Sequence, residues 1–240
     1  MANASSWIRH GLQLVLSLLL ALMAVAIAAL LYLGIPQNAA GMAAKGVCSA
    51  TFVAGRPWQK MLADEMTVLR PTLKNGKAEN CSGTTAGVAN IDRWLQIDGG
   101  KWDVIHFNWG LHDLKHMQAD GKTTSNLATD PPQASVEVYE KNLREIVAKL
   151  KATGAKLIFA ATTPVPAEPM KVYRNNADVL LYNEAAARVM KDNHIPINDL
   201  YTLVQPRMKE LQIQPANVHF VPAGSEVLAE AVVSAIRSQK

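Results

Sequence analysis

An alternation of amphipathic and wholly apolar segments is the feature of this sequence that most restricts its fold. Residues 134–152 place their apolar side chains on one stripe of a helix, and residues 156–163, KLIFAATT, follow as an almost uninterrupted apolar run. A strand that is apolar on both faces is typical of a parallel sheet covered by helices on both sides. The pair therefore predicts a helix followed by a buried parallel strand.

The same alternation extends along the rest of the chain. The other expected elements are a strand at 47–55, a short helix at 57–65, a strand at 66–71, a helix at 84–95, a strand at 102–108, a helix at 177–193, a short strand at 195–198, and helices at 199–211 and 223–236. This order predicts an α/β domain with a mainly parallel sheet. In such sheets binding and catalytic residues gather beyond the carboxyl ends of the strands, where Gly55, Asn108 and Thr163 would lie.

Residues 12–35, LQLVLSLLLALMAVAIAALLYLGI, contain no charged side chain. A helix of this length, at about 1.5 Å per residue, can cross a hydrocarbon layer about 30 Å thick, whereas the apolar core of a cleavable signal peptide has about 7 to 15 residues. We therefore expect a transmembrane anchor or uncleaved signal. Arg9 precedes this segment, and a positive charge on that side favours a cytoplasmic location for the N-terminal residues 1–11. Residues 36–45 would then be a linker, and residues 46–240 a membrane-anchored domain in the periplasm or outside the cell.

The charge distribution argues against a nucleic-acid partner. The formal net charge of +4 comes from 24 basic and 20 acidic residues spread along the chain, and the densest basic patch, Arg70, Lys74 and Lys77, has no interleaved aromatic residue. A solvated face explains this patch. The two cysteines, Cys48 and Cys81, would lie in a compartment that permits disulfides, and the sequence leaves open whether they pair or stay as two buried thiols.

Three histidines and an aspartate crowd the segment HFNWGLHDLKH, residues 106–116. The period of a strand places His106 within the expected strand, whereas His112, Asp113 and His116 follow its end. Their spacing matches no established ligand set, and no His-Glu-x-x-His or Cys-x-x-Cys motif accompanies them. We therefore expect no metal and no cofactor here, with His106 inside the strand and His116 on the surface.

A further histidine, His219, lies in the loop directly before the last expected helix, where Pro222 and Gly224 set the turn. Taken alone, such a histidine is as readily a helix-entry residue as a general base. In the last loop of an α/β domain it can reach a nucleophile near the first strand and take its proton. His219 is therefore a candidate base.

Three segments, ENCSGTTAGVANIDRWL, FNWGLHDL and NVHFVPAGSEVLA, resemble sequence blocks of the SGNH, or GDSL-like, hydrolases. The similarity covers about residues 66–238, in the order and spacing of that family. The resemblance implies a flavodoxin-like three-layer α/β/α sandwich over residues 46–240. It also implies ester hydrolysis by a serine nucleophile and a histidine base, with an oxyanion hole formed by a backbone amide, a glycine and an asparagine side chain.

The resemblance assigns roles to four residues. Gly83 would point its backbone amide at the oxyanion. His112 stands at the asparagine position of the family's Gly-x-Asn-Asp block, and an imidazole N–H can also donate a hydrogen bond. Asn108 is a second candidate donor, and His219 would be the general base.

Two members of the family's catalytic set are missing. Ala216 stands where the orienting aspartate is expected, so Asn217 or a carbonyl would have to orient the histidine ring. The first block reads VAGRPW, with arginine and proline instead of aspartate and serine after Gly55. Ser49 lies too early, inside the expected strand, and Ser82, beside the oxyanion glycine, is badly placed to attack. The sequence therefore identifies no nucleophile.

The lead-in KGVCSATFVAGR, with its preceding anchor, is also similar to that of membrane-anchored serine hydrolases of the β-lactamase type. The chain contains neither their Ser-x-x-Lys motif nor Gly-x-Ser-x-Gly.

Three classes of function follow from these features. The first is an esterase that acts on acyl esters, with acylated carbohydrate among the candidate substrates, and whose site would be lined by the loop at 163–176. The second is a catalytically inactive SGNH-like module that binds such a ligand without cleaving it. The third is a membrane-tethered interaction protein that uses the domain only as a scaffold.

Overall fold

The computed structural model of this chain describes Leu62, residues 69–74 and residues 79–239. The expected anchor at 12–35, the linker at 36–45 and the strand at 47–55 lie outside the described residues. Within the described part of the chain, no helix is both long and apolar enough to cross a membrane. Of the strand expected at 66–71, residues 69–71 are described and form no regular strand.

Three parallel strands form the described sheet, in the order β1-β2-β3. They are β1 (Val104–Phe107), β2 (Lys156–Ala160) and β3 (Ile197–Asn198). Phe107 pairs with Phe159, and Phe159 pairs with Ile197, so these three residues form one row across the sheet. The prediction of an α/β fold with a parallel sheet is confirmed.

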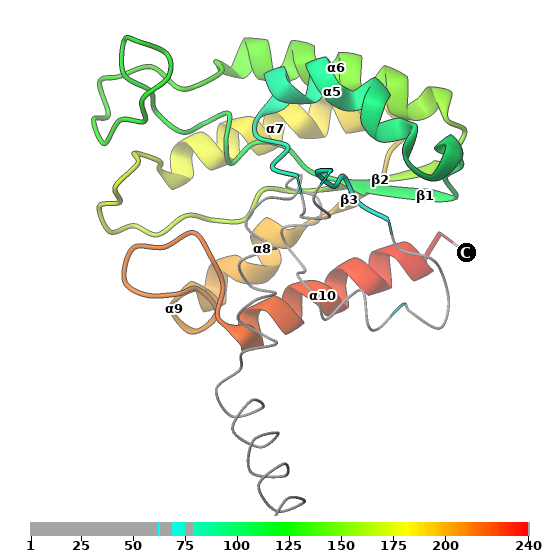
Figure 1. Cartoon of the computed structure of the whole chain (residues 1–240). Coiled ribbons are helices and arrows are strands. Elements are labelled where there is room, and N and C mark those ends of the chain that lie inside the picture. Colours follow the sequence, from blue (N-terminus) through cyan, green and yellow to red (C-terminus); the bar gives the residue numbers. More distant parts are fainter. Residues whose placement is uncertain (1–61, 63–68, 75–78, 240) are drawn as a thin grey trace, which may run out of the picture. The chain divides into compact units, whose positions relative to one another are not determined.

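Helices lie on both faces of this sheet (Figure 1). One face carries α5 (Thr84–Leu95), α6 (Val136–Ala152) and α7 (Asn176–Asn193), and the other carries α8 (Leu200–Val204) and α10 (Pro222–Arg237). The short segments η2 (Ile97–Gly100), η3 (Gln205–Arg207) and α9 (Met208–Leu211) complete the described helices. The flavodoxin-like arrangement as a whole involves strands outside the described residues and stays a prediction.

The helix expected over 199–211 is not continuous. It is divided into α8, η3 and α9, and the break falls at Pro206. Proline has no backbone N–H and its ring clashes with the preceding turn of an α-helix. The sequence prediction was therefore wrong in treating this segment as one helix, although its apolar residues Leu200, Val204 and Leu211 are buried as expected.

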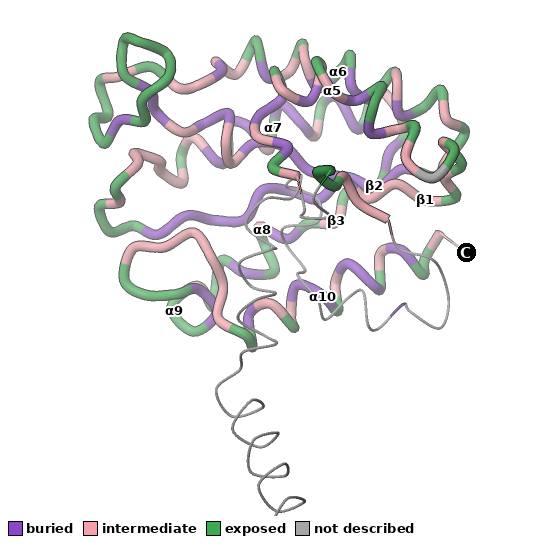
Figure 2. The backbone as a smooth tube through the Cα atoms, in the orientation of Figure 1, coloured by how far each residue is buried: buried purple, intermediate pink, exposed green. Residues whose placement is uncertain are grey.

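The apolar run of β2 divides its side chains between two cores, because successive residues of a strand point to opposite faces. Leu157 and Phe159 pack into the cluster formed with α5, α6 and α7. Ile158 and Ala160 pack into the cluster formed with α8 and α10. The strand is buried along almost its whole length (Figure 2), which explains why its sequence lacks an apolar and polar alternation.

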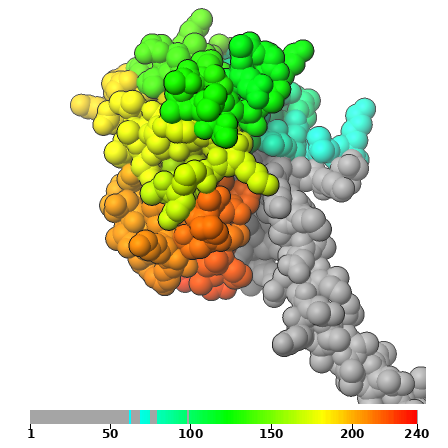
Figure 3. Space-filling view, turned by 90° about the vertical axis from the view of Figure 1, so that its left-hand side faces the viewer, coloured from blue at the N-terminus to red at the C-terminus, as the bar shows by residue number. Residues whose placement is uncertain are grey.

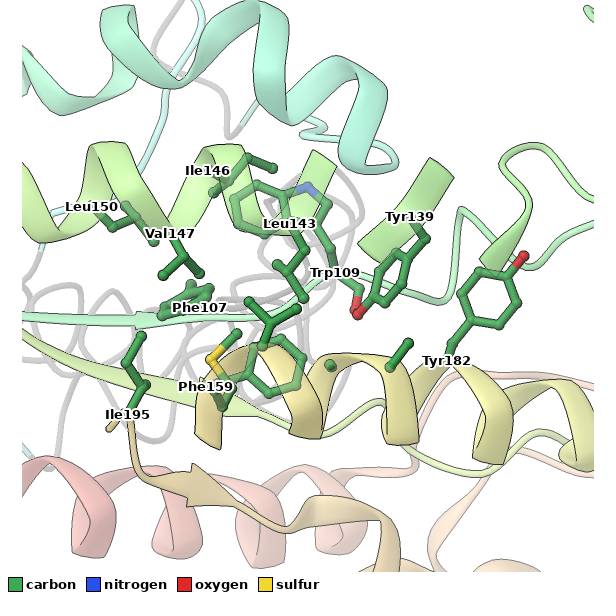
Figure 4. Packing of buried hydrophobic residues seen from close by; sticks show 14 of the residues in the cluster. Phe107, Trp109, Tyr139, Leu143, Ile146, Val147, Leu150, Phe159, Tyr182 and Ile195 are labelled. Carbon is green, nitrogen blue, oxygen red and sulfur yellow. The ribbon is translucent and has the colours of Figure 1, made fainter. Parts of the chain in front are cut away.

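The larger core is built around aromatic rings that lie between the sheet and α6 (Figure 4). Phe107 and Phe159 meet edge to face with ring centroids 5.5 Å apart, and Trp109 lies 6.3 Å from Phe107. The hydroxyl of Tyr139, on α6, donates to the carbonyl of Trp109 at 2.9 Å. The core therefore reaches from the strand into the turn that follows it.

Replacing Phe159 by alanine would remove the ring shared by β2 and the α6 face, and we expect a loss of about 3 to 5 kcal/mol in the free energy of unfolding. Urea denaturation measures this loss. Leu180→Ala on α7 is the control, because Leu180 is 45% exposed and its truncation should cost no more than about 0.5 kcal/mol. Equal losses for the two variants would contradict this assignment of the core.

Candidate functional site

The loops that follow β1 and β2 lie at one edge of the sheet, together with the loop that precedes α10. Figure 3 looks onto this edge, with these loops in green, yellow-green and orange. All four sequence-predicted site residues belong to segments that reach this edge: Gly83, Asn108, His112 and His219. Their catalytic roles stay predictions, while their contacts show what each side chain does in the fold.

Asn108 joins the ends of the two long strands. Its side-chain amide donates to the carbonyl of Ala160 at 2.6 Å and to the hydroxyl of Thr162 at 3.1 Å. An amide group has two N–H donors, so both are engaged inside the protein. In this conformation Asn108 fixes the position of the turn after β1 and has no N–H left to offer a substrate.

Gly110 is required by both its backbone conformation and its surroundings. Its φ of 146° is one that side-chain-bearing residues rarely adopt, and a Cβ at this position would lie 2.4 Å from the hydroxyl oxygen of Thr162. The turn after β1 can therefore approach the end of β2 only with glycine here.

Asp113 connects this turn to the start of α5. Its Oδ1 accepts hydrogen bonds from the backbone N–H of Thr84 at 2.7 Å and from the Thr84 hydroxyl at 2.6 Å. Gly83 precedes them as the N-cap residue, and a Cβ there would lie 2.8 Å from Asp113 Oδ1. The structure thus holds Gly83 against the turn that carries His112.

The carboxyl group of Asp113 is fully buried. Burial raises its pKa from 3.8 to about 6, although the hydrogen bonds from Thr84 favour the ionised form. Its second oxygen, Oδ2, is buried and has no hydrogen-bond partner among the described residues. This carboxylate is therefore held in place by Thr84 at an electrostatic cost.

His112 is held in its neutral form. Burial, and to a smaller extent the positive charges of Lys115 and Arg174, together lower its pKa from 6.5 to about 4. Its Nδ1 is buried and makes no hydrogen bond within the described part of the chain. A neutral imidazole of this kind has one N–H to donate, as the predicted role in an oxyanion hole requires.

Arg174 is a neighbour of His112 that the sequence did not single out. Its Nε donates to the carbonyl of Leu111 at 2.9 Å. Burial lowers the pKa of Arg174 from 12.5 to about 10, and burial together with Arg174 lowers the pKa of Lys115. Neither cation has a carboxylate within ion-pair distance among the described residues. Only the expectation that loop 163–176 lines the site pointed toward Arg174.

A side-chain hydrogen bond holds the start of the loop that carries His219 against the segment that follows β2. Gln212 is buried, and its side-chain amide donates to the carbonyl of Pro164 at 2.8 Å. The backbone N–H of Ile213 donates to the carbonyl of His219 at 2.9 Å. Asn217 Oδ1 accepts from the backbone N–H of His219 at 3.0 Å, so Asn217 shapes the turn of this loop.

The other two histidines of the segment at 106–116 have structural environments. His106 lies in β1, as predicted, with its Nε2 3.3 Å from the amide nitrogen of Asn198. The prediction of a surface position for His116 was wrong, because it is only 7% exposed. His116 is covered by segments that come later in the chain, such as the one around Tyr173. The polar residues next to His116 in the sequence do not predict this burial. Within the described residues, no group of three or more His, Cys, Asp or Glu could hold a metal ion.

The described residues do not identify the nucleophilic serine. Ser49 lies outside them. Ser82 has a φ of 48°, which is uncommon for a residue other than glycine. Its backbone N–H donates to Asn80 Oδ1 at 2.9 Å, which helps to hold this conformation. Of the two cysteines, Cys48 is also outside the described part, and Cys81 is a buried free thiol.

The raised pKa of Asp113 predicts how stability depends on pH. A carboxyl whose pKa is higher in the folded state binds more protons than in the unfolded state between the two values, so stability falls as pH rises from about 4 to about 6. Asp113→Asn keeps an oxygen for Thr84 and removes this titration. Relative to the native protein, the variant should gain on the order of 2 kcal/mol over this range.

Urea denaturation at a series of pH values measures this gain. The control is Asp120→Asn, because hydrogen bonds from Thr123 and Lys122 lower the pKa of the exposed Asp120. That variant should change relative to the native protein with the opposite sign. A native protein and an Asp113→Asn variant with the same pH dependence would contradict the prediction.

Comparisons with known proteins agree with this architecture. The profile of the GDSL-like lipase/acylhydrolase family matches residues 39–227. A search of curated protein sequences finds no match. Among solved structures, an acetyl xylan esterase has a TM-score of 0.56 at 14% identity, covering 75% of this chain and 88% of its own.

Two other structures are similar at the level of the fold. One is a member of the lipolytic G-D-S-L family from Veillonella parvula, with a TM-score of 0.51 at 14% identity over 75% of this chain and 87% of its own. The other is a lipase/acylhydrolase from Enterococcus faecalis, with a TM-score of 0.51 at 17% identity over 66% of this chain and 72% of its own. Since the family profile spans well over half of the sequence, the chain belongs to the GDSL-like lipase/acylhydrolase family, the SGNH hydrolases.

Proposed function

We propose that this chain hydrolyses acyl esters at the carboxyl edge of its sheet. A serine would attack the ester carbonyl while His219 takes the serine proton and passes it to the departing alcohol, and water would then release the acyl group. The N–H groups of Gly83 and His112 would stabilise the negative oxygen of the intermediate. Acyl esters are the substrates of the family to which the chain belongs.

The observation that carries this proposal is the buried pairing of Asp113 with Thr84. Asp113 follows His112 directly, and Thr84 follows Gly83 directly, so the two bonds of 2.7 and 2.6 Å hold the backbone beside His112 against the backbone beside Gly83. The N–H of Gly83 precedes α5 and is not used by the helical ladder. Among the described residues it donates no hydrogen bond, so in this proposal it would donate to the oxyanion.

Two positive charges support the same role for this turn. Arg174 and Lys115 lower the pKa of His112 and lack a carboxylate partner among the described residues. A fixed positive potential in a partly buried site stabilises a developing negative charge without reorganisation. Asn108, whose amide is engaged with β2, would support the site by positioning the turn.

The proposal also covers the class of substrate and the location of the domain. We test acetylated carbohydrate first, because one solved structure of the same fold is an acetyl xylan esterase. We also propose that residues 12–35 anchor the domain to a membrane, facing the periplasm or exterior, on the strength of their charge-free sequence.

A second candidate function is a binding module that has lost catalysis. The observation in its favour is the segment after Gly55, where arginine and proline stand in place of the family's aspartate and serine. A module of this kind would keep the Gly83 and His112 donors and bind an ester without cleaving it.

Labelling by a fluorophosphonate separates the two functions. We expect the full-length chain to be labelled and to hydrolyse a chromogenic acetate ester, and we expect His219→Ala to lose at least about a hundredfold in rate. Ser49→Ala and Ser82→Ala test the two serines near the family's first two blocks. Loss of labelling in either variant identifies that serine as the nucleophile, and labelling that persists in both places the nucleophile elsewhere in the chain. Absence of both labelling and turnover in the native protein would sink the esterase proposal and leave the binding module.

Removing the positive charge at Arg174 should reduce catalysis more than substrate binding. In Arg174→Gln we expect kcat for a neutral acetate ester to fall about tenfold or more with little change in KM, because a neutral substrate gains from the cation mainly when the oxyanion forms. Arg188→Gln is the control, since Arg188 is an exposed arginine that pairs with Glu140 on the helical face. Equal kcat values in the two variants would argue against an electrostatic role for Arg174.

A further inference from the structure

A cleft of about 440 Å³ lies beside the first turns of α6 and α7. None of the residues that line it is a lysine or arginine, and they include three carboxylates and two tyrosines. The titratable lining residues are His116, Asp130, Glu137, Tyr173, Asp178 and Tyr182. The cleft is therefore negatively charged and partly aromatic.

The buried side chain of His116 gives this cleft a directed acceptor. Its Nδ1 lies 3.1 Å from the carbonyl of Leu127, and since a carbonyl can only accept, Nδ1 carries the hydrogen. In the neutral ring the lone pair is then on Nε2. This atom lies 3.9 Å from Asp178 Oδ2, within the distance of an ion pair for a protonated ring but too far for a hydrogen bond, and no hydrogen bond joins it to another described residue.

Asp178 also keeps accepting capacity. Its Oδ2 receives a hydrogen bond from the side-chain amide of Asn175, and its carboxylate is partly exposed. A carboxylate has about four acceptor positions, so further N–H groups can be bound. The ring of Tyr173 lies against His116, with centroids 4.6 Å apart, and supplies an aromatic wall for a positive charge.

The charge and the hydrogen-bonding capacity of these groups determine which kind of ligand the cleft can bind. An acceptor nitrogen, carboxylates and aromatic rings suit a cation that carries N–H donors, whereas an anion would be repelled. A metal ion is less suited, because no three potential ligands come together among the described residues. A concave site of this size fits a small molecule.

We propose that this cleft binds a small organic cation bearing N–H groups, a guanidinium or a primary ammonium. One N–H donates to His116 Nε2 and another to the Asp178 carboxylate, while the charge lies near the face of Tyr173. Such charge-assisted hydrogen bonds are shorter and stronger than neutral ones.

The segment at 173–175 separates this cleft from the proposed ester site. Tyr173 is fixed by two backbone hydrogen bonds, from His116 N–H at 3.2 Å and to Ser125 O at 2.7 Å. Tyr173 and Asn175 line the cleft, whereas the side chain between them, Arg174, reaches Leu111 beside the proposed oxyanion site. The proposal does not depend on ester hydrolysis.

The test is calorimetric titration of the full-length chain with methylguanidine at about pH 8, with methylurea as the uncharged control of the same shape and tetramethylammonium as the cation without N–H groups. We expect saturable binding of methylguanidine at one site per chain, and at least about tenfold weaker binding of each control ligand. No saturable binding of methylguanidine would overturn the proposal. Equal binding of either control ligand would overturn it as well.

Two matched variants locate the site. Asp178→Asn should weaken methylguanidine binding about tenfold or more, because it removes the charge and keeps an acceptor for Asn175. Asp192→Asn makes the same change in charge on the same helix, where Asp192 pairs with Arg144, and should bind like the native chain. Asp130→Asn, also in the cleft, should weaken binding if Asp178→Asn proves unstable on thermal denaturation. Unchanged binding in a folded cleft variant would overturn the proposal.

Discussion

The buried pairing of Asp113 with Thr84 is the interaction on which the rest of the functional edge depends. One carboxylate oxygen accepts from both the backbone and the hydroxyl of Thr84, and the hydroxyl in turn accepts from Asn142 on α6. Three segments distant in sequence, namely the turn after β1, the start of α5 and the second turn of α6, are thereby joined. The raised pKa of Asp113 is the cost of burying this carboxylate, and Gly83 is necessary because a side chain there would displace it.

Residues 173–175 lie between two groups of charges at this edge of the sheet. Tyr173 and Asn175 line a cleft rich in carboxylates, while Arg174, between them in sequence, adds its charge to the surroundings of His112. The proposed ester site, which needs a positive potential, and the proposed cation site, which needs a negative one, would be separated by this segment.

The sequence predicted the class of fold well because the described core follows from local periodicity. The apolar run of β2 and the stripe of α6 each specify an element and its buried face. The helix lies within two residues of its expected ends, and the strand begins where expected but ends three residues early, at Ala160. The break at Pro206 and the burial of His116 were missed. The break arises because Pro206 has no N–H to continue a helix whose apolar pattern runs on past it. The burial of His116 depends on the segment around Tyr173, which is distant in sequence and whose carbonyl accepts from the His116 N–H.

The sequence by itself determined the α/β class, the family blocks and the four candidate site residues, since these depend on residue types and spacing. Only the tertiary structure decided what each candidate contacts. Asn108 has its amide occupied by β2, His112 is kept neutral by burial beside Arg174, and Gly83 is held to the same turn by Asp113. Such assignments depend on atoms brought together from distant segments, and hydrogen bonding and desolvation between them leave no signature in local sequence.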